Sequence, residues 1–309
     1  MRVRILGSGA GGGFPQWNCN CANCRAVRAG KPGFSPRTQS SLAVSADGRN
    51  WLLLNASPDL RRQVEGSPSL QPESDAPPRS SPIKAVAITN GDVDHITGLL
   101  NLREAQPFTL YGAKRTLDVI AANGIFDVLN PLHVERREMP FDLPFPVVCA
   151  GVELGLTLRA FPVPGKIPLY LERENVADFS SSEGDVLGLE VTAPATGTSI
   201  FYLPGCARLD APLKARLKGV NTVFFDGTLW SEDEMLAQGL MSKTGSRMGH
   251  MNMSGPHGSI AAFADLEIPR KVFVHINNSN PVLDAFSPQR AEANAAGWVI
   301  GEDGMEFPI

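Results

Sequence analysis

The chain contains 309 residues, of which 43% are hydrophobic and 19% are charged, and its formal net charge is −4. A chain of this length can bury a large core, and it has no run of Lys or Arg that would give the basic face needed for phosphate binding, which excludes nucleic acid as the main partner. It also lacks an apolar stretch of signal-peptide or bilayer-spanning length, so we expect a cytoplasmic protein without a membrane segment. A homo-oligomer is compatible with the sequence.

Short apolar runs bounded by turn residues predict strands along the whole chain. In chain order they cover Val3–Leu6, Ser40–Val44, Trp51–Leu54, Ala85–Thr89, Phe108–Tyr111, Thr157–Val163, Leu187–Val191, Ser199–Leu203, Thr222–Phe225 and Lys271–His275. Helical patterns cover His95–Glu104, Lys114–Ala122, Ala211–Lys218, Ser259–Asp265 and Gln289–Ala296. Blocks of strands with helices after particular strands predict an α/β (α+β) fold of two packed sheets with helices outside, in a single domain over residues 1–309. Residues 66–82 are rich in Pro and Ser, which indicates a surface loop inside that domain.

A glycine-rich segment, Gly7 to Gly12, follows the first predicted strand and matches the dinucleotide pattern G-x-G-x-x-G. That pattern binds a pyrophosphate only when a helix follows it and an acidic residue lies about 20 positions further on. Here the next residues are GFPQWNC, which cannot begin a helix, and no carboxylate lies near Arg28–Gly33. We therefore expect no nicotinamide or flavin cofactor, and we interpret the glycines as a sharp turn under the rim of an active site.

Three of the five cysteines, Cys19, Cys21 and Cys24, fall within six residues in a C-x-C-x-x-C arrangement. A disulfide framework is typical of short secreted chains with an even set of cysteines, whereas clustered thiolates can wrap one tetrahedral zinc ion. The pattern predicts a structural Zn²⁺ away from the reaction centre, with a fourth ligand from elsewhere. Buried free thiols are the alternative.

The segment TNGDVDHITGL, from Thr89 to Leu99, follows an apolar strand and opens a helix. A structural role alone would make Asp94 the N-terminal cap of that helix, but it does not explain why Asp92, Asp94 and His95 crowd together. The segment resembles the T-H-x-H-x-D-H signature of metallo-β-lactamase-fold hydrolases, with Asn90 and Asp92 in place of the first two histidines. The resemblance implies a four-layer αββα sandwich.

Later segments resemble the same superfamily in the same order: LYG at 110–112, FYLPGCA at 201–207, FFDGT at 224–228, GHM at 249–251 and FVHINN at 273–278. Over essentially the whole chain, the strings LGSGAGGGFPQWNCNCANC, TNGDVDHITGLL and HINNSNP resemble the B-protein family of pyrroloquinoline quinone (PQQ) biosynthesis. Hydrolases of this fold hold two metals that share a hydroxide. The resemblance implies that the first site is lost here, at Asn90, Asp92 and Gly165, and that the bridging aspartate is lost at Gly205 or Cys206.

The resemblance implies that the second site is kept by Asp94, His95 and His275, with Asp92 nearby as a fourth or alternative oxygen ligand. Two imidazoles and one carboxylate form the ligand set of non-haem Fe(II) oxygenases. Because PQQ formation requires oxygen insertion into a tyrosine ring, the family implies a catalytic Fe²⁺ (alternatively Zn²⁺) that hydroxylates the tyrosine of a Glu-Tyr precursor with dioxygen. A metal-dependent hydrolase, and a soluble carrier for transport of PQQ or its precursor to the periplasm, remain the alternatives to this enzyme.

The same strand ends imply that Asp226 and His250 lie beside the metal as catalytic or substrate-facing groups, since an imidazole there could exchange a proton with a phenol. The alternative for His250 is an exposed loop residue. Ser246, Arg247 and Asn252, in the same polar stretch, are candidate contacts for a substrate carboxylate. In the related phosphodiesterase of phosphonate breakdown, the fourth zinc ligand is a histidine at the position of Asn278. Because an amide is a poor zinc ligand, a nearby histidine, His275 included, is the alternative.

Overall fold

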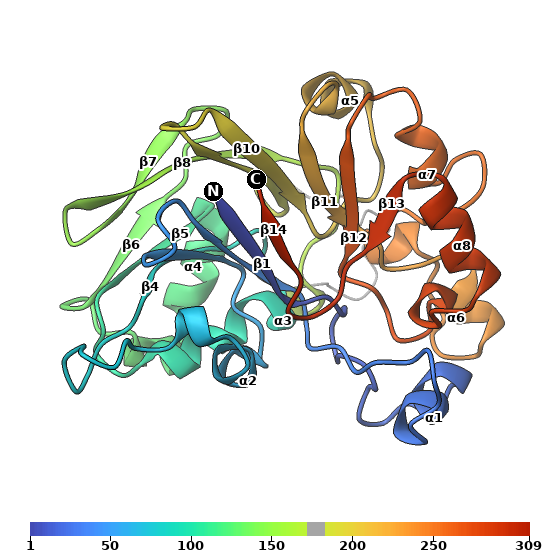
Figure 1. Ribbon diagram of the computed structural model, residues 1–309, viewed down its shortest axis with the longest axis horizontal. Coiled ribbons are helices and arrows are strands. Elements are labelled where there is room, and N and C mark those ends of the chain that lie inside the picture. The colour runs from blue at the N-terminus through green and yellow to red at the C-terminus, as the bar shows by residue number, and fades with distance from the viewer. Residues whose placement is uncertain (172–182) are drawn as a thin grey trace.

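Two packed β-sheets form the centre of the molecule (Figure 1), as seen in a computed structural model that describes residues 1–171 and 183–309. The first sheet has the order β14 (Glu306–Pro308), β1 (Arg2–Gly7), β2 (Ser41–Ser45), β3 (Trp51–Leu54), β4 (Ile83–Ala87), β5 (Phe108–Gly112) and β6 (Val134–Glu138). The second has the order β13 (Trp298–Ile300), β12 (Arg270–Val274), β11 (Thr222–Asp226), β10 (Thr198–Leu203), β9 (Leu187–Ala193), β8 (Val152–Pro162) and β7 (Phe145–Cys149). This is the predicted αββα sandwich.

Helices lie around the two sheets (Figure 1). They are α1 (Ala22–Arg28), α2 (Leu60–Glu65), α3 (Val93–Ile96), α4 (Lys114–Ala122), α5 (Ala211–Leu217), α6 (Glu234–Ala237), α7 (Ser259–Ala262) and α8 (Pro288–Ala295). Short 3₁₀ turns lie at Pro68–Leu70, Thr97–Leu102, Gly124–Val128, Leu169–Leu171, Ser246–Met248 and Pro281–Leu283. No helix in the described part of the chain is long and apolar enough to cross a membrane.

The hydrophobic core lies in three layers that follow from the periodicity of the strands. On β8, the alternate residues Leu154, Leu156 and Leu158 are buried against the other sheet, as the period of two along a strand requires. Strand β4 is buried on both faces, because Ala85 joins the core between the sheets while Val86 joins the layer under the helices of the first sheet. Strands that are covered on both sides give the continuous apolar runs seen in the sequence.

Each predicted strand overlaps an observed one, but the predicted helix His95–Glu104 is wrong. The chain there forms the short helix α3 and then the 3₁₀ turn Thr97–Leu102. Gly98 packs directly on the backbone after β3, where an added Cβ would be 2.1 Å from the Ser57 carbonyl oxygen. The chain therefore has no room for a side chain at this position. The helix predicted over Ser259–Asp265 ends at Ala262.

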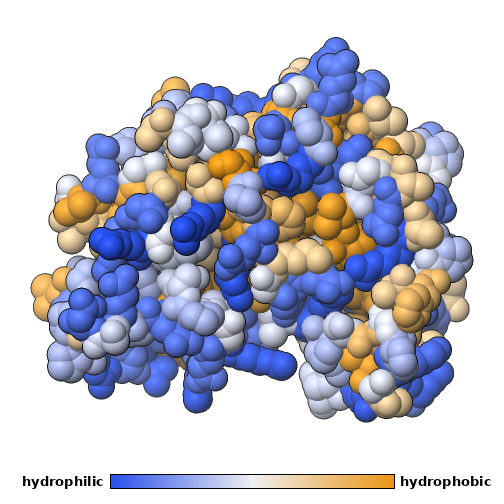
Figure 2. Space-filling view, in the orientation of Figure 1, coloured by the Kyte–Doolittle hydropathy of each residue, from blue (hydrophilic) through white to orange (hydrophobic). Residues whose placement is uncertain are grey.

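The topology brings the segments that carry the candidate site residues to the edge where the parallel strands end. Strands β3 to β6 run parallel to one another, as do β10 to β13. The Asp-His segment follows β4, Asp226 ends β11, and His275 follows β12 directly. In open α/β sheets the carboxyl ends of the strands form the usual binding edge. Figure 2 shows mostly hydrophilic side chains on one face, and a notch at its lower edge between the part that carries α1 and the rest of the molecule.

Candidate metal centre and its cavity

Asp94, His95 and His275 come together between the two sheets. The Nε2 atom of His275 lies 3.2 Å from Oδ2 of Asp94, and the Nε2 atom of His95 lies 3.7 Å from the same oxygen. One ligand atom from each of the three residues lies within 4.8 Å of the others. Such a group of two imidazoles and one carboxylate has the spacing that a single metal ion requires.

The orientation of His95 points one nitrogen toward this group. Its Nδ1–H donates to Oδ1 of Asn90 at 2.8 Å, so Nε2 is left as the nitrogen with a free lone pair. Nε2 is buried and has no hydrogen-bond partner among the described residues. A buried polar atom without a partner is costly, and a metal ion bound at this point would satisfy it. The donors present therefore fit a metal.

His275 is held in the same sense by Thr228. The Thr228 hydroxyl donates to Asp226 Oδ1 at 2.7 Å and can therefore accept from His275 Nδ1–H at 2.8 Å, which leaves Nε2 directed at Asp94. The backbone of His275 has φ +56°, in the left-handed region that residues with a side chain rarely adopt. This strained conformation places the imidazole at the end of β12 rather than in line with the strand.

Charge at the centre is balanced between Asp94 and the two histidines. Burial would raise the pKa of Asp94, but the charge of His95 and the hydrogen bond from His275 outweigh it and hold that pKa well below its usual range. Burial lowers the pKa of His95, whereas contact with Asp94 raises the pKa of His275 despite burial. Without a metal, protonated His275 therefore donates Nε2–H to the Asp94 carboxylate. A metal bound there would displace that proton.

Asp226 and His250 lie beside this group, as predicted. The Asp226 carboxylate is fully buried and accepts hydrogen bonds from Cys206 N, Thr228 N, the Thr228 hydroxyl and His250 Nδ1, at 2.7 to 3.0 Å. Since four donors occupy its lone pairs, it is a poor metal ligand here, even though it lies close to His250 and His275. The ring of His250 stacks on that of His275 with centroids 5.1 Å apart, so the exposed-loop alternative for His250 is wrong.

The positions that resemble the lost metal site have other roles in the structure. Gly165 is pressed against Val186, where an added Cβ would lie 2.5 Å from a methyl carbon, so no side chain fits there. The Cys206 thiol is buried in the core layer under the helices of the second sheet, and burial raises its pKa. Asp92 is not part of the three-residue group, and its Oδ1 lies 3.7 Å from Lys166 Nζ.

A cavity of about 560 Å³ opens over the metal-ligand group. Its wall includes Ala10 and Gly11 from the glycine-rich turn, and an added Cβ on Gly11 would lie 3.3 Å from the Asp94 carboxylate. Gly12 and Gly13 have φ +89° and +67°, so the interpretation of this segment as a sharp turn under the rim is confirmed. Helix α1 begins only at Ala22, too late for a pyrophosphate site.

The polar residues predicted to contact a substrate carboxylate lie outside the wall of this cavity. Ser246 donates to Glu232, and the Asn252 side chain donates to the Ser254 carbonyl. Arg247 lies between them on the exposed turn. The cations that do line the cavity are Lys166 and Lys243.

The three clustered cysteines converge around the side chain of Asn278. The Nδ2 atom of Asn278 lies 3.1, 3.6 and 3.4 Å from the sulfurs of Cys19, Cys21 and Cys24. Burial would raise the pKa of Cys21, but N–H donors led by Cys24 N outweigh it and lower that pKa, whereas burial raises the pKa of Cys24 to about 12. His275 is occupied by Thr228 and Asp94, so the structure gives the fourth side of this cluster to Asn278 and not to a histidine.

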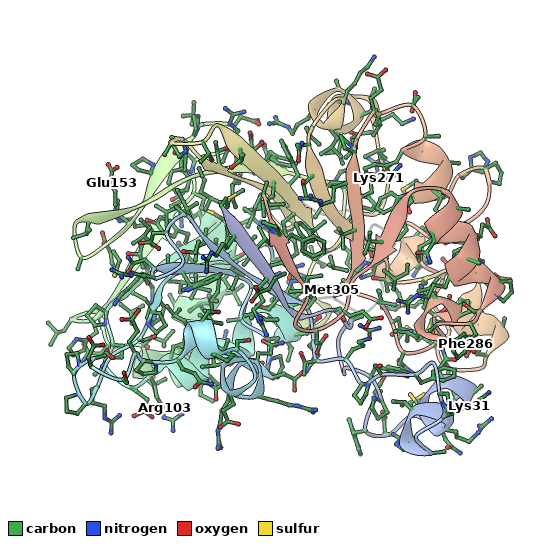
Figure 3. All side chains as sticks on the ribbon, in the orientation of Figure 1. Lys31, Arg103, Glu153, Lys271, Phe286 and Met305 are labelled. Carbon is green, nitrogen blue, oxygen red and sulfur yellow. The ribbon has the colours of Figure 1, made fainter. Side chains whose placement is uncertain are left out.

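The cysteine loop is docked on the segment that follows β12. Asn23 donates to the carbonyls of Asn278 and Asn280, and Ala285 N donates to Gly33 O. Figure 3 shows Lys31 and Phe286, which flank these contacts, on the same side of the molecule. Cys19 and Asn278 also line the main cavity, so the cluster is adjacent to the candidate metal centre rather than remote from it.

Sequence reasoning missed Thr228 and Lys166. Thr228 stands two residues after Asp226, and a hydroxyl at a strand end between a carboxylate and a later histidine is a usable signal. Lys166 follows Gly165 directly, at the position compared with a ligand histidine. A lysine next to the position of a lost metal ligand could have been recognised as a cation that takes the place of the metal.

Comparisons with known proteins show the family and the fold of the chain. The model of the β-lactamase superfamily domain matches residues 50–276. The chain is 49% identical over 310 residues to coenzyme PQQ synthesis protein B of Xanthomonas oryzae pv. oryzae, and 50% identical over 304 residues to that of Gluconacetobacter diazotrophicus; the alignments cover 100% and 98% of both chains. The crystal structure of Zn²⁺-bound PqqB from Methylobacterium extorquens superposes with a TM-score of 0.94 at 47% identity, over 100% of both chains.

A diphosphatase of the PhnP family superposes with a TM-score of 0.67 at 20% identity, over 99% of this chain and 97% of that one, which supports the fold alone. Identity near one half over the full length, together with the matching crystal structure, is much stronger evidence and shows the family. The chain belongs to the coenzyme PQQ synthesis protein B family, within the β-lactamase superfamily.

Proposed function

We propose that this member of a PQQ-biosynthesis family is a hydroxylase that uses Fe(II) and dioxygen to oxidise the tyrosine ring of a Glu-Tyr precursor. The observation that carries the proposal is the three-residue group Asp94, His95 and His275, in which His95 Nε2 is buried and lacks a partner among the described residues. Two imidazoles and a carboxylate that face an open cavity are the ligand set of mononuclear iron oxygenases. A bound Fe(II) ion would supply the redox chemistry and adjacent open positions for dioxygen and substrate.

The residues around this group suit a phenolic substrate. Asp226 accepts from His250 Nδ1, which fixes the His250 tautomer and leaves its Nε2 to accept the phenol proton. Thr228 and Asn90 orient His275 and His95, so both ligand nitrogens stay aimed at the metal position. The cavity volume of about 560 Å³ lies in the range of small-molecule sites.

We further propose that Cys19, Cys21 and Cys24 bind a structural Zn²⁺ with the Asn278 side chain as the fourth ligand. The two ends of an amide are nearly isosteric, so a rotation of the Asn278 amide by half a turn would direct Oδ1, a ligand atom, at the centre of the sulfurs. Metal binding would also ionise Cys24, whose pKa is raised by burial.

The experiment is anaerobic loading of the protein with Fe(II), followed by exposure to dioxygen with the dipeptide Glu-Tyr and ascorbate as the two-electron reductant. We expect dioxygen consumption and a dipeptide that has gained one oxygen atom on its ring, with the second oxygen atom released as water. His95→Ala and His275→Ala should lose both iron binding and oxygen consumption while they keep the cysteine-bound zinc. Zinc-loaded protein is the redox-inert control.

Other outcomes identify the other classes of function. Cleavage of the dipeptide by zinc-loaded protein, without oxygen consumption, would identify a hydrolase. Tight binding of PQQ or its precursor without any reaction in either metal form would identify a carrier. Either result would contradict the proposed hydroxylase.

A further inference from the structure

Lys166 places a cation in the wall of the cavity that opens over the candidate metal centre. It follows Gly165, where no side chain fits, and its Nζ atom lies 3.7 Å from Oδ1 of Asp92, which replaces the second histidine of the signature. The side chains of Lys166 and Asp92 are 19% and 24% exposed, so both are largely withdrawn from solvent while they face the cavity.

The hydrogen-bonding capacity of this ammonium group is largely unused by the described residues. An ammonium carries three N–H donors. Lys166 Nζ donates one long hydrogen bond to the Ile167 carbonyl, at 3.4 Å, and its separation from Asp92 exceeds hydrogen-bond distance. At least one donor is therefore available to an anion in the cavity, where partial burial strengthens a charged hydrogen bond.

The loop that carries Lys166 is held at both ends, so the fold fixes the position of its backbone. Ala207 N donates to the Pro164 carbonyl at 2.8 Å. The Tyr170 hydroxyl donates to the Gly91 carbonyl at 2.6 Å, which ties the loop to the segment that carries Asp94 and His95. A preorganised cation contributes more to binding than a mobile one, because less side-chain and loop order is lost on binding.

The rest of the cavity wall suits an aromatic ring. Three thioether side chains, Met235, Met241 and Met248, line it. The Met235 sulfur is itself held by Asn277 Nδ2 at 3.1 Å. Sulfur atoms make favourable contacts with aromatic rings, and flexible methionines adapt to planar ligands. The cavity therefore combines a metal-ligand group, a wall for a ring and a cation for a carboxylate.

We infer that Lys166 is a specificity-determining residue that binds a substrate carboxylate, and that it thereby selects an aromatic compound that carries one. This inference rests on the proposed function only for the choice of Glu-Tyr as the probe. It replaces Ser246, Arg247 and Asn252 as the residues expected to contact a carboxylate, since those three lie outside the cavity wall. Lys243 is a second cation in that wall.

The test is calorimetric binding of two probes to zinc-loaded protein, in which no redox turnover occurs. The probes are Glu-Tyr and Gln-Tyr amide, its isostere without carboxylates, and both carry the same N-terminal amine. We expect wild-type protein to prefer Glu-Tyr, and Lys166→Met to reduce that preference by about tenfold or more, the usual effect of losing one charged hydrogen bond. Lys218→Met, at an exposed position after α5, is the matched control and should leave the preference unchanged.

Two further variants separate direct binding from neutralisation of Asp92. If Lys166 served only to balance Asp92, the double variant Lys166→Met/Asp92→Asn would recover wild-type preference, and that recovery would overturn the inference. Direct contact predicts that the double variant remains weak and that Lys166→Arg, which keeps the charge, retains most of the preference. Zinc content should be unchanged in Lys166→Met and Lys166→Arg, because lysine is not a ligand.

The remaining outcomes distinguish the inference from the proposed function. A Lys166→Met protein that keeps the wild-type preference would show that this inference alone is wrong. Wild-type protein that binds neither probe would exclude Glu-Tyr as substrate, and with it the proposed reaction, whereas wild-type protein that binds both probes equally would overturn the role of Lys166 alone.

Discussion

At Asn90 an amide stands where hydrolases of this fold carry a histidine, and its Oδ1 atom holds His95 by Nδ1. Removal of a group that orients a ligand typically lowers metal affinity by about 10–100-fold, whereas removal of the ligand abolishes binding. Asn90→Ala should therefore fall between wild-type protein and His95→Ala in a competition titration of Fe(II) against a chelator. Asn101→Ala, at an exposed position on the following turn, is the control. Wild-type affinity in Asn90→Ala would contradict the orienting role, and complete loss would make Asn90 a ligand.

The buried carboxyl group of Glu234 should make the stability of the protein depend on pH. Burial raises the pKa of its carboxyl group to about 7 from 4.5, although Ser279 and the Trp230 N–H donate to it. Between these two values the folded protein holds a proton that the unfolded chain has released. The free energy of unfolding should therefore decrease as the pH rises from 4.5 to 7, by about 3 kcal/mol from this group.

Urea denaturation at several pH values checks this dependence. Glu234→Gln, which stays neutral, should lose this part of the pH dependence and should gain stability relative to wild-type protein as the pH rises to 7. Glu292→Gln is the control, because Glu292 lies at an exposed position on α8. Parallel pH profiles for wild-type protein and Glu234→Gln would contradict the assignment.

At the scale of elements, the loop of Cys19, Cys21 and Cys24 with α1 forms a unit that is docked on the segment after β12. Cys24→Ala should lose one equivalent of zinc and increase protease cleavage near α1, because the thiolate ligands hold the loop in place. Cys149→Ala, which removes another buried thiol, is the matched control and should keep its zinc. Metal analysis and limited proteolysis measure the two effects. Unchanged zinc content in Cys24→Ala would rule out the cysteine site.

Elements differ in how well the sequence predicts them. Strands buried on both faces, such as β4 and β11, are visible as apolar runs. Strand β6 was missed because Val134–Glu138 is mostly charged and forms the edge of its sheet. Helix α1 was missed because Cys21 caps it and cysteines occupy its start, so its sequence resembles a ligand loop. The position of a strand in its sheet and the docking of a loop are set by tertiary packing, so the local periodicity of the sequence does not show them.

At the scale of the whole molecule, the interface between the two sheets carries the stability. Phe224 on β11 is fully buried there, and its ring contacts Phe307 on β14 of the other sheet with centroids 5.4 Å apart. Phe224→Ala should destabilise the protein by about 3–5 kcal/mol, the usual cost of a large core truncation. Phe286→Ala removes the same ring from a position that is 78% exposed and should have little effect. Similar denaturation midpoints for the two variants would contradict this account of the core.

The sequence motifs predicted the fold and the metal-ligand group, whereas the cavity depended on long-range packing. Asp94, His95 and His275 could be named because strand ends in this fold carry ligands. Lys166 reaches the cavity from a loop and Met235 from helix α6, and no spacing in the sequence places them together. The docking of Asn278 on the cysteines likewise depends on how the segment after β12 pairs with the residues after β1.

The left-handed backbone of His275 has a consequence for chemical complementation. At φ +56° a glycine is unstrained, whereas any residue with a Cβ is destabilised by about 1–2 kcal/mol. His275→Gly should therefore be more stable than His275→Ala, the reverse of the usual order for these two residues. The glycine variant also leaves a space with the shape of the lost ring, between His95 and His250. Free imidazole added to His275→Gly should enter that space and restore metal binding, so the metal ligand at this position could be exchanged for a small molecule of chosen basicity.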